Sequence, residues 1–473
     1  MNESRVERRL PASPRRLFWP GVVVAVGLVL GAALLPAAEL TPAARGRNLL
    51  LSQPYLPADF DQQVFDELWT TWEEPARSEA EQAPLARRRI MAMQRYGLTP
   101  HPDDPSRSTQ YVVDALGTWT MSCLACHQGQ VNGQAIPGVP NSNYAIETLT
   151  EEVRLVKLRQ RKPFGHMDIG SLFLPLGTTN GTTNAVMFGV ALMRHRDPDL
   201  TIVQRPPRLD LIHHDMDAPA WWHYKKRRSL YADGFAPKGH RMLMQFLLVK
   251  ENGPERFHAW EEGFRDIEHW IESLESPAWQ WPIDATLAEQ GRSLFNQHCA
   301  DCHGTYGKDA VYPERIVDIA EVGTDRVRFD SLTSKERGDL NKSWFGHFDA
   351  GWGAEAAAMK DRVAPQGYVA PPLDGLWATA PYFHNGSVPT LWHVLHPATR
   401  PVVWKRSNTG YDQTKVGLEV EEMESLPKKK LSSAERHRHF DTTKRGKSAA
   451  GHDFPDVLED TEKAAVLEYL KTL

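Results

Sequence analysis

Two short cysteine motifs contain the residues of this chain that are best suited to chemistry. The first reads Cys123-Leu-Ala-Cys126-His127 and the second reads Cys299-Ala-Asp-Cys302-His303, and together they use all four cysteines. Two thiols three residues apart can each form a thioether with one porphyrin, and the histidine that follows then lies within reach of the iron. The motifs predict two covalently bound haem c groups, with His127 and His303 as the proximal iron ligands.

Other uses of paired cysteines explain these motifs less well. A zinc site built from four cysteines does not require a histidine after each pair. A redox-active dithiol of the thioredoxin type is expected near a strand–helix–strand unit, and neither motif lies in such a pattern. The trailing histidines therefore favour haem over zinc or disulfide chemistry.

The elements around the second motif are typical of a small haem domain. The helix that runs into Cys299 has one face formed by Ala288, Gly291, Leu294, Phe295 and His298. The last residues, 460–473, also have an apolar face at helical spacing. Gly291 would allow these two helices to approach closely where they cross. No equally clear helix precedes the first motif.

The rest of the chain bounds the fold class. No segment is long and strand-rich enough for a large sheet, no internal repeat is visible beyond the two motifs, and a Pro- and Trp-rich boundary falls near residues 276–284. We predict a mainly α protein with two cytochrome c-type haem domains and long loops. The domains are expected at 40–280 and 281–473, after an N-terminal signal or anchor segment at 1–39.

The N-terminal segment indicates export. Five arginines precede an uncharged stretch at residues 17–38, whose continuous apolar part at 22–35 suits either a long signal-peptide core or a short membrane anchor. No clean cleavage site ends the stretch, which favours an uncleaved anchor. The basic flank places everything after residue 40 outside the cytoplasm. Haem c is also attached there, so we expect the chain on the periplasmic side of the inner membrane or secreted to the periplasm.

Composition excludes one large class of function. The 473 residues carry a formal net charge of −5, with 41% hydrophobic and 24% charged residues. A mildly acidic chain is not expected to bind nucleic acid. The chain is longer than a single hydrophobic core usually organises, which agrees with two domains.

A C-terminal sequence pattern resembles that of a known superfamily. The segment Ala370-Pro-Pro-Leu-Asp-Gly-Leu-Trp377 and the segment at 380–391, Ala-Pro-Tyr-Phe-His-Asn-Gly-Ser-Val-Pro-Thr-Leu, resemble the C-terminal domain of bacterial dihaem cytochrome c peroxidases. The methylamine-utilisation dihaem enzymes share this pattern, and the version here looks closest to the rubber-oxygenase branch. The resemblance covers roughly residues 110–473 and is strongest from residue 285 onward.

The resemblance implies a division of labour between two haems. One haem is held open for peroxide or dioxygen, and the other is six-coordinate and passes electrons. In the oxygenase branch the N-terminal haem is the open one. Carried over here, the haem held by His127 would be catalytic and the haem held by His303 would be the relay. Peroxidases of this group often carry calcium between the domains, but no calcium ligands can be assigned in this sequence.

The chain departs from the peroxidase pattern at the distal ligands. Residues 128–165 contain no histidine to close the first haem, and residues 383–422 contain no methionine to ligate the second. The rubber-oxygenase pattern uses a C-terminal histidine, and His452 fits that position. His384 is the alternative ligand, or a hydrogen-bond donor to a haem propionate. Met359 and Met423 are the remaining candidates.

Two tryptophans and several cations complete the candidate site. Trp221 and Trp222 could lie between the haems and carry an oxidising equivalent from one to the other, because indole is oxidisable and stacks well. The family contains a tryptophan in such a role, and ordinary packing is the alternative. The cations that could neutralise haem propionates, or simply be solvated, are Arg194, Arg196, Lys225 and Lys226.

The sequence leaves three alternative functions. The first is a haem-dependent oxidoreductase of the peroxidase or oxygenase type, acting on peroxide or dioxygen with a redox partner or organic substrate. The second is a non-catalytic dihaem electron-transfer cytochrome in which both haems are six-coordinate. The third is a membrane-held gas sensor, which no recognisable signalling domain supports.

Overall fold

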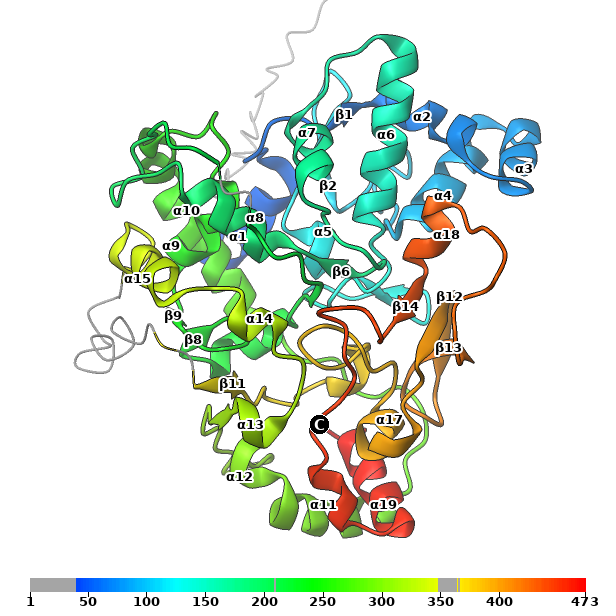
Figure 1. Cartoon of the computed structure of the whole chain (residues 1–473), viewed down its shortest axis with the longest axis vertical. Helices are drawn as coiled ribbons and strands as arrows, with labels where there is room; N and C mark the ends of the chain where they lie inside the picture. Colours follow the sequence, from blue (N-terminus) through cyan, green and yellow to red (C-terminus); the bar gives the residue numbers. More distant parts are fainter. Residues whose placement is uncertain (1–39, 208–209, 348–363, 365) are drawn as a thin grey trace, which may run out of the picture. The chain divides into compact units, whose positions relative to one another are not determined.

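The computed structural model describes residues 40–207, 210–347, 364 and 366–473 (Figure 1). About 43% of the described residues are helical and 13% are in strands, which agrees with a mainly α fold. The predicted signal or anchor segment at 1–39 and Met359 lie outside the described residues. No helix within the described ranges is long and apolar enough to cross a membrane.

The N-terminal part, residues 40–280, begins with one helix and ends with another, and the two pack against each other. Helix α1 (Pro42–Ser52) begins at the N-cap Thr41, whose hydroxyl accepts a hydrogen bond from the Ala44 N–H. It packs against the long helix α10 (Pro254–Ser273). A Cβ atom at Gly46 would lie 2.0 Å from the Asp266 carbonyl oxygen, so only glycine permits this approach. The part of the chain that contains the first motif therefore also has a pair of crossing helices. The two helices lie more than 200 residues apart in the sequence.

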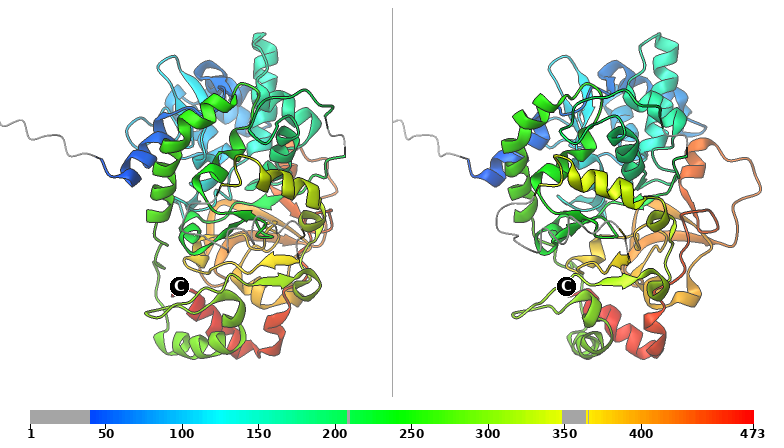
Figure 2. Two further views of the ribbon diagram at one scale, coloured as in Figure 1. Left: turned by 90° about the vertical axis from the view of Figure 1, so that its left-hand side faces the viewer. Right: turned by 60° about the vertical axis from the view of Figure 1, so that its left-hand side comes forward.

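The C-terminal part repeats this arrangement. Helix α11 (Ala285–His298) begins at Asp284, whose carboxylate accepts from two backbone N–H groups, and leads directly into the second motif. Helix α19 (Asp460–Leu470) packs across it, and Figures 1 and 2 show the two side by side. A Cβ atom at Gly291 would lie 1.9 Å from the Ala465 carbonyl oxygen. The close approach predicted at Gly291 is confirmed.

Most of the remaining described helices are short, apart from α4 and α6. Between α1 and α10 lie α2 (Gln62–Glu67), α3 (Ala76–Gln82), α4 (Leu85–Tyr96), α5 (Leu124–His127), α6 (Ile146–Gln160), α7 (His166–Phe173), α8 (Ala185–Met193) and α9 (His240–Leu243). Between α11 and α19 lie α12 (Ala300–His303), α13 (Ile319–Val322), α14 (Val327–Asp330), α15 (Ser334–Lys342), α17 (Leu391–Leu395) and α18 (Ser433–His437). Long loops separate them, as the sequence predicts.

The described strands form small antiparallel sheets. One three-stranded sheet has the order β1 (Phe60–Asp61), β3 (Thr118–Met121), β2 (Tyr111–Val113), and the other has the order β13 (Gly417–Met423), β12 (Val403–Asp412), β14 (His439–Asp441). The two-stranded pairs are β4 (Gln130–Val131) with β5 (Gln134–Ala135), β6 (Thr182–Thr183) with β7 (Met216–Asp217), β8 (Ser229–Leu230) with β9 (Ala236–Pro237), and β10 (Ile316–Asp318) with β11 (Gly367–Val369). Each of these sheets is too small to form the main core.

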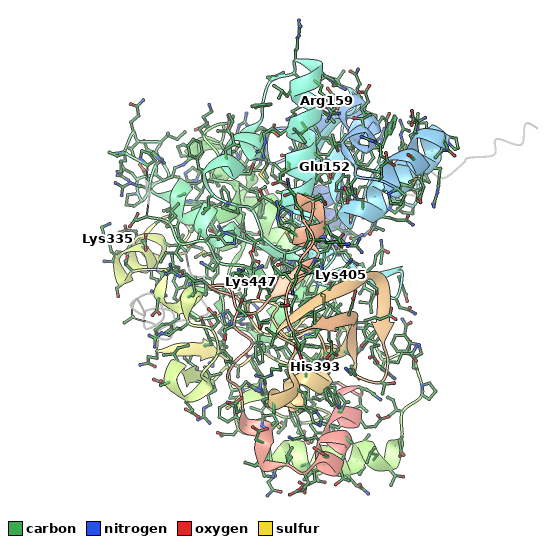
Figure 3. The ribbon with its side chains drawn as sticks, turned by 45° about the vertical axis from the view of Figure 1, so that its right-hand side comes forward. Glu152, Arg159, Lys335, His393, Lys405 and Lys447 are labelled. Carbon is green, nitrogen blue, oxygen red and sulfur yellow. The ribbon has the colours of Figure 1, made fainter. Side chains whose placement is uncertain are left out.

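The two parts are joined by buried polar contacts. Lys447, labelled in Figure 3, forms an ion pair of 2.9 Å with the buried carboxylate of Asp215. The Asn180 N–H donates to the His437 carbonyl oxygen over 2.8 Å. Residues 40–473 accordingly pack as one unit. The predicted division into two domains near residue 280 stays a prediction, although that position falls between α10 and α11.

The helix crossing at Gly291 gives a stability prediction. Gly291→Ala should lower the free energy of unfolding by about 1–3 kcal/mol, because the added methyl group overlaps the Ala465 carbonyl and overpacking outweighs the gain in helix propensity. Gly263→Ala in α10 is the matched control, since its methyl group would meet the end of the Leu49 side chain at 3.1 Å. Thermal unfolding of both variants tests this. An equal or higher melting temperature for Gly291→Ala would contradict it.

Candidate haem sites

Each cysteine motif folds as a single helical turn. In α5 the His127 N–H donates to the Cys123 carbonyl oxygen over 3.2 Å, and in α12 the His303 N–H donates to the Cys299 carbonyl oxygen over 3.0 Å. Residues three and four apart in such a turn share one face. Both cysteines and the histidine of each motif are therefore presented together, as attachment to one porphyrin requires.

Both histidines are oriented by a proline carbonyl. The Nδ1 atom of His127 lies 3.1 Å from the Pro219 carbonyl oxygen, and the Nδ1 atom of His303 lies 2.9 Å from the Pro371 carbonyl oxygen. An imidazole that donates from Nδ1 keeps its lone pair on Nε2 for a metal. Burial lowers the pKa of His127 to about 4 and also lowers that of His303, so both rings are neutral at pH 7. The donor set fits a haem iron at each motif.

The thiols do not form a zinc or disulfide site. None of the four cysteines forms a disulfide. Burial raises the pKa of Cys123 to about 11 and those of Cys126 and Cys299 to about 12, which disfavours reactive free thiolates of the redox-dithiol type. In the described part of the chain, no cluster of three or more His, Cys, Asp or Glu side chains could hold a metal ion. The zinc alternative finds no support.

His452 faces His303 at a distance suited to a metal between them. The two ring centres are 6.2 Å apart. Two metal–imidazole bonds of about 2 Å each, plus roughly 1 Å from each nitrogen to its ring centre, sum to about 6 Å. Burial lowers the pKa of His452 to about 3, so it is also neutral at pH 7. The placement fits His452 as the second axial ligand of this haem.

The backbone holds His452 in an unusual conformation. Its φ angle is 54°, in the left-handed region, and its N–H donates to the Val322 carbonyl oxygen over 2.6 Å. The rings of Phe383 and Phe454 lie 5.9 Å and 5.4 Å from the imidazole. A strained residue that its neighbours hold in place is often part of a functional site.

His384, the alternative ligand, lies elsewhere. Its ring packs against that of Tyr368, with centres 4.3 Å apart, rather than against His303. Its Nε2 atom is buried without a hydrogen-bond partner in the described structure, and desolvation lowers its pKa to about 3. The geometry favours His452 over His384 as the ligand opposite His303.

Trp221 contacts the first motif, and Trp222 contacts the segment that orients His303. The Trp221 ring stacks on the ring of His127, with centres 4.5 Å apart and planes 19° apart. The Trp222 indole N–H donates to the Asp374 carbonyl oxygen over 2.7 Å, and Asp374 lies three residues after the Pro371 that holds His303. The neighbouring His223 ring contacts the same carbonyl at 2.7 Å. A short contact path therefore runs from one proximal histidine to the segment that orients the other.

The four cations proposed as propionate partners have other contacts. Arg196 donates to four backbone carbonyl oxygens, those of Leu200, Leu248, Val249 and Asn252. Arg194 donates to the Pro206 carbonyl oxygen, and Lys225 and Lys226 pair with Glu275 and Asp374. The sequence did not single out Arg328, whose buried Nε and Nη1 atoms have no partner in the described structure.

Comparison with known proteins supports the haem assignment. Residues 367–405 match the family described as RoxA-like, cytochrome c-like, and this segment includes Pro371. The chain is 27% identical over 299 residues to the uncharacterized protein y4iM of Sinorhizobium fredii (strain NBRC 101917 / NGR234), covering 54% of this chain and 64% of that protein. It is 30% identical over 254 residues to y4iJ of the same strain, covering 41% of each.

The chain spans less than two thirds of the length of both relatives, and the printed name of neither states an activity. The family match and the geometry of the two motifs agree on the cofactor class. The chain contains a RoxA-like, cytochrome c-like segment, which supports a cytochrome that binds haem c covalently.

Proposed function

We propose that this protein is an exported dihaem c-type oxidoreductase of the peroxidase or oxygenase type. The first haem is open at its sixth position, and the second relays electrons. The observation that carries the proposal is an asymmetry between two otherwise similar sites. Each proximal histidine donates to a proline carbonyl, but His303 faces a second histidine whereas the aromatic ring packed on His127 is that of Trp221.

The residues around the first site support catalysis. When bound, a haem iron with a free coordination position supplies binding and activation of peroxide or dioxygen. The Pro219 carbonyl keeps His127 in the tautomer that ligates through Nε2 and increases its basicity. The absence of a histidine at 128–165 removes the family's usual residue for closing this site.

The residues around the second site support a relay. Two histidine ligands give a lower potential than a histidine and methionine pair. The Trp221–Trp222 pair offers an oxidisable contact path between the two sites. A redox partner or organic substrate would thus donate an electron at the second site. That electron would reduce the oxidising equivalent formed at the first site.

The location outside the cytoplasm rests on the N-terminal sequence. The arginine-rich start and the uncharged stretch at 17–38 favour export with membrane attachment. Covalent haem attachment outside the cytoplasm is consistent with this. The proposed location is the periplasmic side of the inner membrane.

Low-temperature EPR of the fully oxidised protein tests the proposed function. We expect one high-spin ferric signal from the first haem and one low-spin signal from the second. Two low-spin signals that persist after addition of one electron would instead indicate an electron carrier. Haem staining that finds fewer than two haems per chain would contradict the dihaem assignment.

The second-haem ligand is tested by substitution. His452→Ala should convert the low-spin signal to high-spin, because it removes the ring opposite His303, while the haem stays attached through its thioethers. His384→Ala is the matched control and should keep the low-spin signal. Electronic absorption and EPR spectra of both variants provide the measurement. The opposite pattern would assign the ligand to His384.

The tryptophan path is tested by kinetics. Trp221→Phe and Trp222→Phe should each slow electron transfer between the haems, because phenylalanine is much harder to oxidise than indole, without loss of haem. Trp279→Phe, a change in the aromatic cluster with Trp281 and Trp377, serves as the control. Stopped-flow reduction followed at the absorption bands of each haem measures the rate. Unchanged rates in both single variants and in the double variant would exclude the path.

A further inference from the structure

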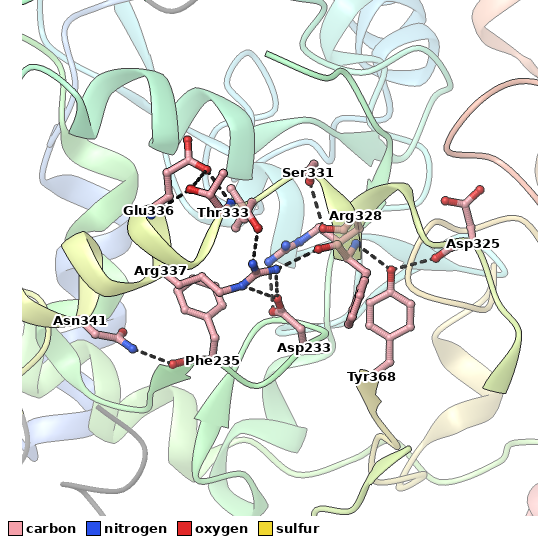
Figure 4. A network of polar contacts seen from close by, with 12 residues as sticks. Asp233, Phe235, Asp325, Arg328, Ser331, Thr333, Glu336, Arg337, Asn341 and Tyr368 are labelled. Atoms are coloured by element: carbon pink, nitrogen blue, oxygen red, sulfur yellow. Dashed lines mark hydrogen bonds and ion pairs between the residues drawn. The ribbon is translucent and has the colours of Figure 1, made fainter. Parts of the chain in front are cut away.

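Four arginines are buried among the described residues, and one of them has almost no partners. Arg196 donates to four backbone carbonyl oxygens. Arg328 and Arg337 share the carboxylate of Asp233, at 3.2 Å and 2.9 Å (Figure 4). Arg406, by contrast, is 8% exposed and forms a single hydrogen bond and no ion pair in the described part of the chain. Burying a charge without a counter-charge is costly, so an anionic partner for Arg406 is expected.

The free donors of Arg406 share one edge of its guanidinium. Its Nη1 atom donates to the Ser142 carbonyl oxygen, whereas Nε is buried without a partner and Nη2 forms no hydrogen bond within the described ranges. The N–H groups of Nε and Nη2 point the same way, and such an edge matches the two oxygens of a carboxylate. Arg45 shows this match elsewhere in the protein, because its Nε and Nη2 atoms each donate over 2.7 Å to one oxygen of Asp266.

Arg406 stays charged at neutral pH. Burial lowers the pKa of its guanidinium to about 10, which is still well above 7. Asp217 affects this pKa but forms no ion pair with Arg406 in the described structure. Burial also raises the pKa of the Asp217 carboxyl well above its usual value, which disfavours Asp217 as the counter-ion. The expected anion is therefore not supplied by a described side chain.

Arg406 lines a cavity of the size of a small-molecule site. The cavity has a volume of about 380 Å³, within the roughly 300–1,000 Å³ that is usual for such sites. One wall comes from α4, the β4–β5 turn and residues 141–143, and the other comes from β12, β13 and residues 378–380. Ser142, which accepts the hydrogen bond from Arg406, belongs to this lining, so the guanidinium lies at the cavity wall.

The other lining residues suit an organic molecule. Met93, Leu98 and Leu418 supply apolar surface, which an organic ligand would cover and an inorganic anion would leave facing water. The Asn143 side-chain amide also lines the cavity and forms no hydrogen bond in the described structure. At about 30 Å³ for each water-sized atom, the cavity has room for about a dozen heavy atoms.

We propose that this cavity binds an organic monocarboxylate. The carboxylate pairs with the Nε and Nη2 edge of Arg406, and the apolar part of the ligand lies against Met93, Leu98 and Leu418. The Asn143 amide supplies a further hydrogen bond. The site is separate from the two haem motifs, because none of their cysteines or histidines lines the cavity. The inference does not depend on the proposed redox function.

A ligand in this cavity would connect the two parts of the chain close to the first motif. Asn141 lines the cavity, and its backbone N–H donates to the Cys126 carbonyl oxygen over 2.8 Å. The opposite wall belongs to the C-terminal part. A ligand that binds the folded chain alone raises its stability as the ligand concentration rises. The melting temperature therefore reports binding independently of any enzymatic activity.

Calorimetric titration of the full-length, haem-loaded protein with sodium benzoate tests the site. Arg406→Gln should bind benzoate at least about tenfold more weakly than the wild type, because it loses a charged donor of two hydrogen bonds. The matched control is Lys405→Gln, which removes the same charge one position earlier in β12, from a side chain that pairs with Glu435 and does not line the cavity (Figure 3). No binding by the wild type, or equal affinities in the two variants, would overturn the proposal.

Two further variants cover the case in which Arg406→Gln fails to fold. Arg406→Lys retains the charge but cannot place two N–H groups side by side. Asn143→Asp adds a negative charge to the cavity wall. Each variant should bind benzoate more weakly than the wild type and show a smaller rise in melting temperature with benzoate. Wild-type affinity in both variants would contradict the assignment.

Other probes identify the chemistry that the cavity recognises. Benzamide, which has the same ring without the charge, should bind more weakly than benzoate, and equal binding of the two would refute the role of Arg406. Sodium phosphate should also bind more weakly, whereas tighter phosphate binding that is lost in Arg406→Gln would replace the organic carboxylate with an inorganic anion. Benzoate that shifts the haem absorption bands equally in the wild type and in Arg406→Gln would place the probe at the iron and overturn the proposal.

Discussion

The hydrogen bond from a proximal histidine to a proline carbonyl is the interaction on which both sites depend. It selects the tautomer and directs Nε2 away from the backbone, while burial keeps the ring neutral against the opposite effect of this hydrogen bond on the pKa. It also determines which segments must meet: residues 217–222 return to the first motif and residues 370–377 return to the second. Trp222 of the first segment donates to the Asp374 carbonyl oxygen of the second, so the two segments that orient the histidines also contact each other.

The structure reveals a repeat that the sequence conceals. Each half encloses its motif between a first and a last helix, and each pair crosses at a glycine, Gly46 or Gly291, whose Cβ position is occupied by a carbonyl of the partner helix. Each half then supplies a proline carbonyl to its histidine. The segments between these points differ in length and composition, which is why comparing the sequence with itself shows only the two motifs.

The sequence was most informative where chemistry fixes the spacing. The helical turns of the two motifs, the mainly α fold and the close approach at Gly291 could be predicted, because one helical turn or one packing requirement determines them. His452 as the ligand opposite His303 stays a prediction, with which the 6.2 Å between the ring centres agrees. The pairing of α1 with α10 could not, since helical periodicity does not say which distant helix is the partner. The role expected for Arg196 at a haem propionate stays a prediction, and its guanidinium binds four backbone carbonyls, an arrangement that no sequence pattern reveals.

The carbonyl of Asp374 accepts from the indole of Trp222 and also contacts the ring of His223. Both donors are buried and come from the N-terminal part, whereas the acceptor comes from the C-terminal part. A fragment ending near residue 280 would leave both groups without this acceptor, and an unmade buried hydrogen bond costs about 1–3 kcal/mol. The two parts that carry the cysteine motifs are therefore expected to fold as one cooperative unit.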